Sequence, residues 1–233
     1  MNAIVTGATK GIGRAVVWHL AANNYHVVLC ARNQKELDKL LVELRETYPK
    51  LSFFGLKADM EYISEVKAFA HFSLKSLGSV DVLVNNAGLY IPSELLLEDE
   101  LSLERQMKVN VYAPHLLSKY CAEKMKLTNS GHIINICSMA SIDPVLSAGS
   151  YSISKAALLS LTKVLRNELM PFGIKVTAVL PGATLTDSWS GTTLPSERFV
   201  SADDVALSII NCLQMSAGAN IDEVIIRPLK GEI

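Results

Sequence analysis

The chain has 233 residues, of which 49% are hydrophobic and 19% charged, and its 22 basic and 23 acidic residues give a net charge of −1. This composition is typical of a compact globular protein and excludes an intrinsically disordered chain. The sequence shows no basic stripe and no lysine-rich tail, so we expect no nucleic-acid partner.

The start of the sequence, its apolar runs and the spacing of its cysteines and histidines indicate where the protein is located and whether it binds a metal. Met1 runs almost directly into an apolar segment, which leaves no room for a signal peptide, and no apolar run approaches the ~20 residues that span a bilayer. The four cysteines form no C-x-x-C pair and are predicted to be buried thiols, while the five histidines show no ligand spacing. We therefore expect a cytoplasmic protein without a metal site and without membrane contact.

Apolar runs alternate with amphipathic helical patterns along the whole chain, which we interpret as one domain over residues 1–233. Several of the expected strands are apolar on both faces, as strands covered by helices on both sides are. The expected strands are 2–6, 26–31, 52–57, 80–85, 132–137, 174–180 and 222–227, and the expected helices are 11–23, 34–47, 62–76, 100–126, 151–170 and 202–214. This alternation predicts an α/β fold with a doubly wound parallel sheet of about seven strands and helices on both faces.

A glycine-rich turn follows the first expected strand and precedes the first expected helix. Gly7 allows a tight turn, Gly11 lets the backbone approach a pyrophosphate, and Gly13 lets helix and strand pack closely. The N–H groups of the first helical turn are then available to phosphate oxygens. The pattern predicts a dinucleotide site, and a purely structural turn is the alternative interpretation.

The end of the second strand bears on which dinucleotide binds. A fold that uses NAD usually carries Asp or Glu here to bind the ribose 2′-hydroxyl, but this chain has Ala31 followed by Arg32. Without a carboxylate, we expect nothing to repel a 2′-phosphate, and Arg32 can bind it bidentately with Lys10 as a second cation. NADP(H) is therefore favoured over NAD(H), the alternative being that both cations are merely solvated.

Ser138, Tyr151 and Lys155 indicate catalytic chemistry. Tyr151 and Lys155 are four residues apart and share one face of a helix, where an ammonium favours the phenolate. We expect Lys155 to lower the pKa of Tyr151 by ~3 units from its ordinary value near ~10, making it a general acid–base group. Ser138, from another element, would bond the oxygen that gains charge when a carbonyl is reduced. A solvated surface pair is the alternative for the Tyr-x-x-x-Lys spacing.

Residues 183–201 form the longest stretch without strong periodicity and are rich in Thr, Ser, Gly and Pro. The segment follows the carboxyl end of an expected strand, the edge at which ligands bind in such sheets. We predict that it is a substrate lid, with a partly apolar pocket formed by Leu185, Trp189, Leu194 and Phe199.

With further motifs in the same order, the chain resembles the short-chain dehydrogenase/reductase family, in its small single-domain branch. The matching motifs are T-G-x-x-x-G-x-G over 6–13, an Asp at 59 after the third strand, N-N-A-G over 85–88, a helix Asn at 110, the Ser…Tyr-x-x-x-Lys set, and P-G at 181–182. The resemblance covers essentially all of the chain and implies a Rossmann-type sheet.

The resemblance also implies roles for the site residues. Tyr151 would protonate the carbonyl oxygen, Ser138 would orient and polarise the carbonyl, and Lys155 would bind the nicotinamide ribose. Asn110 would hold a water in the proton relay, although a helix asparagine is otherwise a local kink or packing feature. The cofactor-binding residues expected from all of these signals are Gly7, Thr9, Lys10, Gly11, Ile12, Arg32, Asp59, Met60, Asn86, Ala87, Gly88, Tyr151, Lys155, Pro181, Gly182 and Thr184.

Two of these residues have structural alternatives. Asp59 is also placed to cap the helix that begins near residue 62, and Thr184 lies in what could be a simple lid turn. Both interpretations remain open at the level of sequence.

The leading hypothesis is an NADP(H)-dependent oxidoreductase that reduces a ketone to a secondary alcohol. A 3-oxoacyl thioester and a small carbonyl or pterin are candidate substrates, and the short lid argues against a bulky steroid. The alternative is a dinucleotide-sensing or scaffold protein of the same fold without turnover. We also expect a homo-oligomer, dimer or tetramer, formed through the helices at 100–126 and 151–170.

Overall fold

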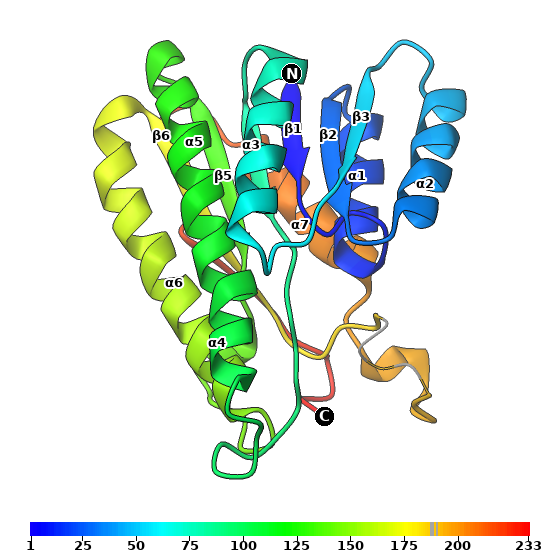
Figure 1. Cartoon of the computed structure of the whole chain (residues 1–233), viewed down its shortest axis with the longest axis vertical. Helices are drawn as coiled ribbons and strands as arrows, with labels where there is room; N and C mark the ends of the chain where they lie inside the picture. The colour runs from blue at the N-terminus through cyan, green and yellow to red at the C-terminus, as the bar shows by residue number, and fades with distance from the viewer. Residues whose placement is uncertain (187–188, 190) are drawn as a thin grey trace.

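The computed structural model describes residues 1–186, 189 and 191–233, and within these its core is a sheet of seven parallel strands with helices on both faces (Figure 1). The strand order is β3-β2-β1-β4-β5-β6-β7. The strands are β1 (Asn2–Val5), β2 (His26–Ala31), β3 (Phe53–Lys57), β4 (Val82–Asn85), β5 (Gly131–Ile136), β6 (Ile174–Pro181) and β7 (Glu223–Ile226). The predicted doubly wound, Rossmann-type α/β fold is confirmed.

The helices also follow the predicted pattern, with one difference. They are α1 (Gly11–Ala22), α2 (Gln34–Thr47), α3 (Ile63–Leu77), α4 (Ser102–Met107), α5 (Ala113–Thr128), α6 (Gly149–Leu169) and α7 (Ala202–Leu213). Short turns are the π-helical η1 (Lys108–Tyr112) and the 3₁₀ turns η2 (Met139–Ser141), η3 (Met170–Phe172) and η5 (Ser196–Arg198). The single helix expected over 100–126 is thus divided into α4 and α5 by a π-turn, a feature that hydrophobic periodicity does not reveal.

The helices form two layers, one on each face of the sheet. Helices α1, α2 and α7 share one hydrophobic core with the sheet, and α3, α5 and α6 share the other. In α2, Leu37, Leu40, Leu41 and Leu44 recur at helical spacing and are all buried. Burial of each such side chain contributes roughly 1.5–3 kcal/mol, so this spacing fixes which face of the helix meets the sheet.

The strand order reverses between β1 and β4, which lie side by side in the middle of the sheet. Their connections leave in opposite directions, so the chain cannot fill the crevice at their carboxyl ends. The glycine loop after β1 and the Asn86–Gly88 turn after β4 both lie at this reversal.

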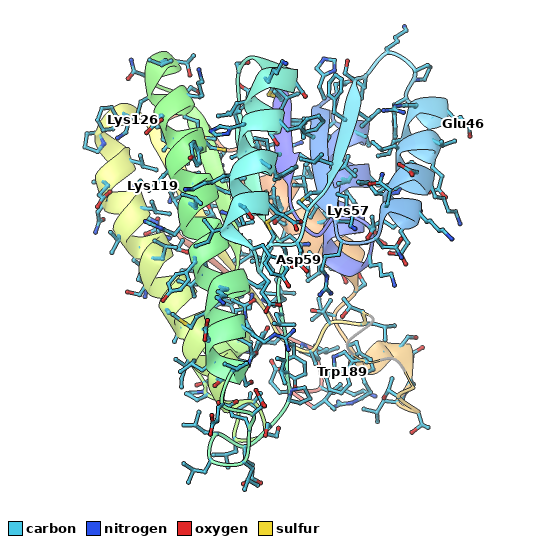
Figure 2. The ribbon with its side chains drawn as sticks, in the orientation of Figure 1. Glu46, Lys57, Asp59, Lys119, Lys126 and Trp189 are labelled. Atoms are coloured by element: carbon cyan, nitrogen blue, oxygen red, sulfur yellow. The ribbon has the colours of Figure 1, made fainter. Side chains whose placement is uncertain are left out.

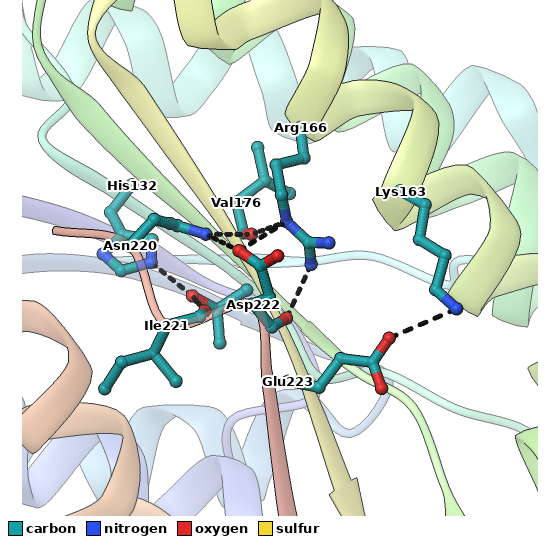
Figure 3. Close-up of polar contacts among 9 residues, drawn as sticks. His132, Lys163, Arg166, Val176, Asn220, Ile221, Asp222 and Glu223 are labelled. Atoms are coloured by element: carbon teal, nitrogen blue, oxygen red, sulfur yellow. Dashed lines mark hydrogen bonds and ion pairs between the residues drawn. The ribbon is translucent and has the colours of Figure 1, made fainter.

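A polar network holds β7, which is the edge strand at the end of the sheet away from β3 (Figure 3). Arg166, on α6, donates from Nε to the Val176 carbonyl at 2.9 Å and from Nη2 to the Asp222 carbonyl at 2.6 Å. Nε2 of His132, on β5, lies 2.8 Å from the hydroxyl oxygen of Thr177, on β6. These contacts join α6, β5, β6 and the segment that leads into β7.

No helix in the described part of the chain is long and apolar enough to cross a membrane. All four cysteines are free and buried, as the sequence predicted.

Burial of His132 predicts a loss of stability in acid. Burial, with a smaller contribution from Lys175, lowers the pKa of His132 from 6.5 to about 4. Between pH 6.5 and about 4, the unfolded chain therefore binds a proton at His132 that the folded chain does not bind. The free energy of unfolding falls as the pH drops through this range, by up to about 3 kcal/mol. Urea denaturation at a series of pH values should show this loss in the parent protein.

The variant His132→Gln should lack this part of the acid dependence, whereas a variant at the exposed His115 should retain it. Identical pH profiles for the parent and His132→Gln would show that His132 is not the responsible group.

Candidate active site

Tyr151 and Lys155 lie in the first two turns of α6, and Ser138 follows the end of β5. Helix α6 packs across β6 and the η2 turn, which brings its amino-terminal end to the carboxyl edge of the sheet. The three residues that the sequence singled out therefore come together from two elements. The Ser138 side chain acts to lower the pKa of Tyr151, and the Lys155 ammonium lies 5.7 Å from the centroid of the Tyr151 ring.

The ammonium of Lys155 is almost completely buried, with 4% of the residue exposed. Its Nζ donates a 2.7 Å hydrogen bond to the carbonyl of Ile136, the last residue of β5. It also faces the turn after β4, since a Cβ placed on Gly88 would lie 3.7 Å from Nζ. Burial lowers the pKa of Lys155 to about 8. A charge held this dry interacts strongly with any group brought beside it.

The acidity of Tyr151 differs from the sequence-based prediction. Burial raises the pKa of Tyr151 to about 12, and the hydrogen bond from Ser138 offsets only part of that rise. The expected lowering by Lys155 is absent because its ammonium points to the Ile136 carbonyl and lies over the ring rather than at the hydroxyl. Tyr151 is thus a protonated phenol in this geometry, and a weaker acid than the sequence predicted.

Ser138 is held by its own local turn. Its Oγ accepts a hydrogen bond from the Ala140 N–H at 3.1 Å, and its N–H donates to Ser141 Oγ at 3.2 Å. This reciprocal capping box starts the η2 turn and fixes the side chain of Ser138 beside Tyr151. Its hydroxyl is therefore preorganised before any substrate arrives.

Asn110 lies in the π-turn η1 and is fully buried. Its side chain forms a clamp: Oδ1 accepts from the Leu89 N–H at 2.8 Å, while Nδ2 donates to the Leu89 carbonyl at 2.9 Å and to Ser154 Oγ at 2.8 Å. These bonds use both donors of the amide and join the segment after β4 to α6, next to Lys155. In this structure the Asn110 side chain positions other groups rather than presenting an open site for water.

The glycine loop is tied to the turn after β4. The Asn86 amide donates to the Thr6 and Gly7 carbonyls, each at 3.0 Å, and Thr6 Oγ1 accepts from the Asn86 N–H at 3.0 Å and from the Ala87 N–H at 2.9 Å. Gly7 has φ +64°, and a Cβ on Gly13 would overlap the Gly7 carbonyl. The amino-terminal turn of α1, with Gly11 and Ile12, thus meets the crevice between β1 and β4.

Glu36, which the sequence analysis did not single out, lies beside Lys10 of the glycine loop. Arg32 is exposed at the end of β2, after the buried Ala31. Lys10, however, forms an ion pair with Glu36 of α2, Nζ to Oε1 at 3.2 Å. The expectation that no carboxylate lies at this end is therefore wrong, because Glu36 arrives from the next helix rather than from the strand.

Asp59 and Met60 follow β3, and Figure 2 shows Asp59 below the end of α3. Asp59 accepts from the Glu61 N–H at 3.0 Å, while Tyr62 is the cap residue of α3. The N-cap alternative for Asp59 is therefore wrong. Met60 is buried beside it.

Pro181 ends β6, and the segment after it turns across the carboxyl edge. Thr184 Oγ1 donates to the Gly182 carbonyl at 2.9 Å, and a Cβ on Gly11 would meet the Thr186 side chain at 2.9 Å. The region expected as a lid, 183–201, therefore begins against the glycine loop. Its residues 187, 188 and 190 lie outside those that the structure describes.

In the described part of this segment, residues near its beginning contact residues near its end. Thr184 pairs with Val200 in a parallel bridge, and Trp189 packs on Phe199 with ring centroids 5.0 Å apart. Figure 2 shows Trp189 beyond the edge at which the strands end. Leu185 and Leu194 are 42% and 39% exposed, so they supply apolar surface that is not covered.

Two more residues border this edge without having been predicted. Tyr90 packs edge-on against Tyr151, with ring centroids 4.9 Å apart and planes at 89°, and it is 43% exposed. Glu232, near the end of the chain, accepts a 3.1 Å hydrogen bond from the Ala183 N–H and lies against Gly182. Tyr90 could have been suspected from its place two residues after Gly88, whereas no sequence signal brings Glu232 to Gly182.

A buried polar network supports the site from below. Asn85 Nδ2 donates to Asn135 Oδ1 at 2.8 Å, and Asn135 Nδ2 donates to Thr162 Oγ1 at 2.9 Å. These two hydrogen bonds link β4 to β5 and β5 to α6, within a largely apolar core. Buried amides are costly unless paired, so the hydrogen bonds formed here favour one relative position of the three elements, although the buried Asn85 Oδ1 has no hydrogen-bond partner among the described residues.

Comparisons with known proteins agree with this geometry. The family model for short chain dehydrogenases matches residues 1–195. A 3α-hydroxysteroid dehydrogenase from Mediterraneibacter gnavus is 37% identical over 185 residues, which are 79% of this chain and 74% of that protein.

Solved structures are similar over the whole chain. An alcohol dehydrogenase from the archaeon Thermococcus sibiricus, complexed with 5-hydroxy-NADP, has a TM-score of 0.92 and 26% identity, covering 100% of this chain and 98% of its own. A metagenomic short-chain oxidoreductase in complex with NADP has a TM-score of 0.85 and 30% identity, covering 98% and 96%.

The buried charge of Lys155 predicts that removing it stabilises the fold. Its pKa is lowered from 10.5 to about 8, so the folded chain holds the proton less well than the unfolded chain. The resulting cost is fully present below pH 8 and disappears as the pH rises to 10.5. After allowance for the lost hydrogen bond to Ile136, Lys155→Met should raise the free energy of unfolding at neutral pH by about 1–2 kcal/mol.

Urea denaturation tests this, with Lys163→Met on the exposed side of the same helix as the control. The control should change stability by less than about 1 kcal/mol. A destabilised Lys155→Met protein would contradict the prediction.

Proposed function

The chain belongs to the short-chain dehydrogenase family of oxidoreductases, and from this premise we propose that it is an NADP(H)-dependent reductase that converts a ketone to a secondary alcohol. The observation that carries the proposal is the meeting of Ser138, Tyr151 and Lys155 beside the crevice between β1 and β4. A protein that only binds a dinucleotide has no need of these three groups together.

The side chains divide the work of carbonyl reduction. Bound NADPH would supply the hydride. Tyr151 donates its phenolic proton to the carbonyl oxygen, and Ser138 holds that oxygen through its preorganised hydroxyl. Lys155 binds the nicotinamide ribose from its buried position at the end of β5. Asn110 positions α6 against the segment after β4.

The proposed contacts with this cofactor run from the glycine loop to the segment after β6. The amino terminus of α1, with Gly7, Gly11 and Ile12, forms a site for the pyrophosphate. We assign Thr9, Lys10 and Arg32 to the adenosine 2′-phosphate, and Asp59 and Met60 to the adenine. The remaining contacts on the ribose and nicotinamide side are assigned to Asn86, Ala87, Gly88, Pro181, Gly182 and Thr184.

NADP(H) is proposed over NAD(H) on two grounds. Ala31 occupies the position at the end of β2 where an NAD site usually carries an acidic residue, and the cation Arg32 follows it. The structurally similar alcohol dehydrogenase and metagenomic oxidoreductase are complexes with 5-hydroxy-NADP and NADP.

The substrate pocket is proposed to lie between Tyr90 and the lid over residues 183–201. Tyr90, Leu185 and Trp189 give it aromatic and apolar walls, which suit a small carbonyl compound or the acyl chain of a 3-oxoacyl thioester. A steroid ketone is tested beside them because one relative is a 3α-hydroxysteroid dehydrogenase.

We further propose that two or more copies associate through α5 and α6. Tyr112, the last residue of η1 before α5, is 50% exposed, and Ile153 and Val164 on α6 are 43% and 50% exposed, so an isolated chain would leave them in water. Light scattering on the purified protein tests this.

The function is tested by measuring cofactor oxidation with NADPH and NADH, side by side, across ketones, 3-oxoacyl thioesters, pterins, quinones and steroid ketones. Turnover of any carbonyl with NADPH supports the proposal. Tight NADPH binding without turnover on the whole panel would favour the alternative, a dinucleotide sensor.

Removing the acid should leave binding intact while abolishing most of the chemistry. Tyr151→Phe should reduce kcat by about 10²–10⁴-fold, because its hydroxyl is the proton donor, while NADPH still binds by calorimetry. Tyr48→Phe, which removes a phenol at the end of α2, serves as the control and should retain activity. Unchanged turnover in Tyr151→Phe would show that Tyr151 is not the proton donor.

The choice of cofactor depends on Arg32. Arg32→Ala should weaken NADPH binding by about 10- to 100-fold and leave NADH binding almost unchanged, because only NADPH carries the 2′-phosphate. Lys39→Ala, an exposed cation of the same region paired with Glu43, controls for the general loss of charge. Equal losses for both cofactors would show that Arg32 does not recognise the phosphate.

A further inference from the structure

The carboxylate of Glu36 lies against the glycine loop at its adenosine end. Glu36 Oε1 is 3.2 Å from Lys10 Nζ, and Oε2 accepts a hydrogen bond from Thr9 Oγ1 at 3.4 Å. Both partners belong to the loop, and both are assigned above to the 2′-phosphate. One side chain therefore binds the two loop residues that the phosphate would use.

The local structure explains why Glu36 reaches this position. Asn33 caps α2, and its side chain accepts from the N–H groups of Lys35 and Glu36 at 3.0 and 3.3 Å. This cap fixes the first turn of α2 directly after Arg32, and it directs the side chain of Glu36 back toward the loop after β1. A carboxylate thus reaches the adenosine end although Ala31 occupies the usual acidic position.

The electrostatic consequence has a definite sign. A 2′-phosphate carries up to two negative charges at neutral pH and would need Lys10 as a counter-ion. In the structure Lys10 already shares its charge with Glu36, and the phosphate would have to bind beside that carboxylate. A ribose 2′-hydroxyl carries no charge and is not repelled, so the carboxylate disfavours NADPH selectively.

We propose that Glu36 is a specificity-determining residue that weakens the preference for the 2′-phosphate by competing with it for Lys10 and Thr9. The inference rests on the proposed function, since it assumes that a dinucleotide binds along the glycine loop. Beyond that function, Glu36 would reduce the difference in affinity between NADPH and NADH, so that NADH could also bind and react.

Glu43 provides a matched control on the same helix. It carries the same charge and also forms ion pairs, with Arg14 at 2.9 Å and with Lys39 at 3.9 Å, but neither partner belongs to the group assigned to the 2′-phosphate. Substituting Glu43 changes the net charge of the protein as much as substituting Glu36 does.

The test uses nucleotides that lack nicotinamide, so it does not depend on turnover. Adenosine 2′,5′-bisphosphate and adenosine 5′-monophosphate are titrated by calorimetry into the full-length parent, Glu36→Gln and Glu43→Gln. Glu36→Gln should bind the bisphosphate about 3- to 10-fold more tightly, with the monophosphate changed by less than about 2-fold. Glu43→Gln should match the parent for both nucleotides.

Charge reversal provides a second variant. Glu36→Lys should tighten the bisphosphate further than Glu36→Gln, and both gains should shrink as salt is added, since exposed charges are screened. Unchanged or weaker bisphosphate binding in Glu36→Gln overturns the inference, as does an equal gain in Glu43→Gln. Failure of the parent to bind either nucleotide would instead contradict the proposed function.

Discussion

The whole arrangement depends on one constraint, the reversal of strand order between β1 and β4 in a parallel sheet. Parallel strands end at the same edge, and connections that leave in opposite directions leave a crevice between these two ends. The glycine loop, the Asn86–Gly88 turn and Lys155 all meet at that crevice. The backbone of the loop can come close because Asn86 ties it to the end of β4, so two loops from distant parts of the chain behave as one surface.

The polar groups beneath this surface show how the site is held in place against the preference of the core for apolar residues. Asn85, Asn135 and Thr162 connect β4, β5 and α6, while Asn110 connects the π-turn to Leu89 and Ser154. Each buried amide is costly unless its partners are present, so these bonds select one register of the elements. Lys155 differs from these paired amides, because burial of its ammonium lowers its pKa and so costs stability at neutral pH.

The two ends of the proposed cofactor site are governed by different physics. At the catalytic end, burial dominates, since it raises the pKa of Tyr151 and lowers that of Lys155, and the hydroxyl of Ser138 is fixed by its own turn. At the adenosine end, Arg32, Lys10 and Glu36 are largely in water, so selectivity there comes from a balance of screened charges. If a dinucleotide binds as we propose, modest changes of charge at Arg32, Lys10 or Glu36 should alter its affinity without altering the packing around Tyr151 and Lys155.

The sequence by itself determined the order of strands and helices, the glycine loop, and the Tyr151–Lys155 pair, because hydrophobic period and short-range spacing are local properties of the chain. The tertiary structure alone decided the π-turn at Asn110, the contact of Tyr90 with Tyr151, the approach of Glu232 to Gly182 and the ion pair of Glu36 with Lys10. These depend on where side chains from separate elements point once the sheet is assembled. The direction of the pKa change at Tyr151 belongs with them. Spacing indicates that an ammonium is near the phenol, whereas only packing decides how far each group is removed from water and that the ammonium faces a carbonyl.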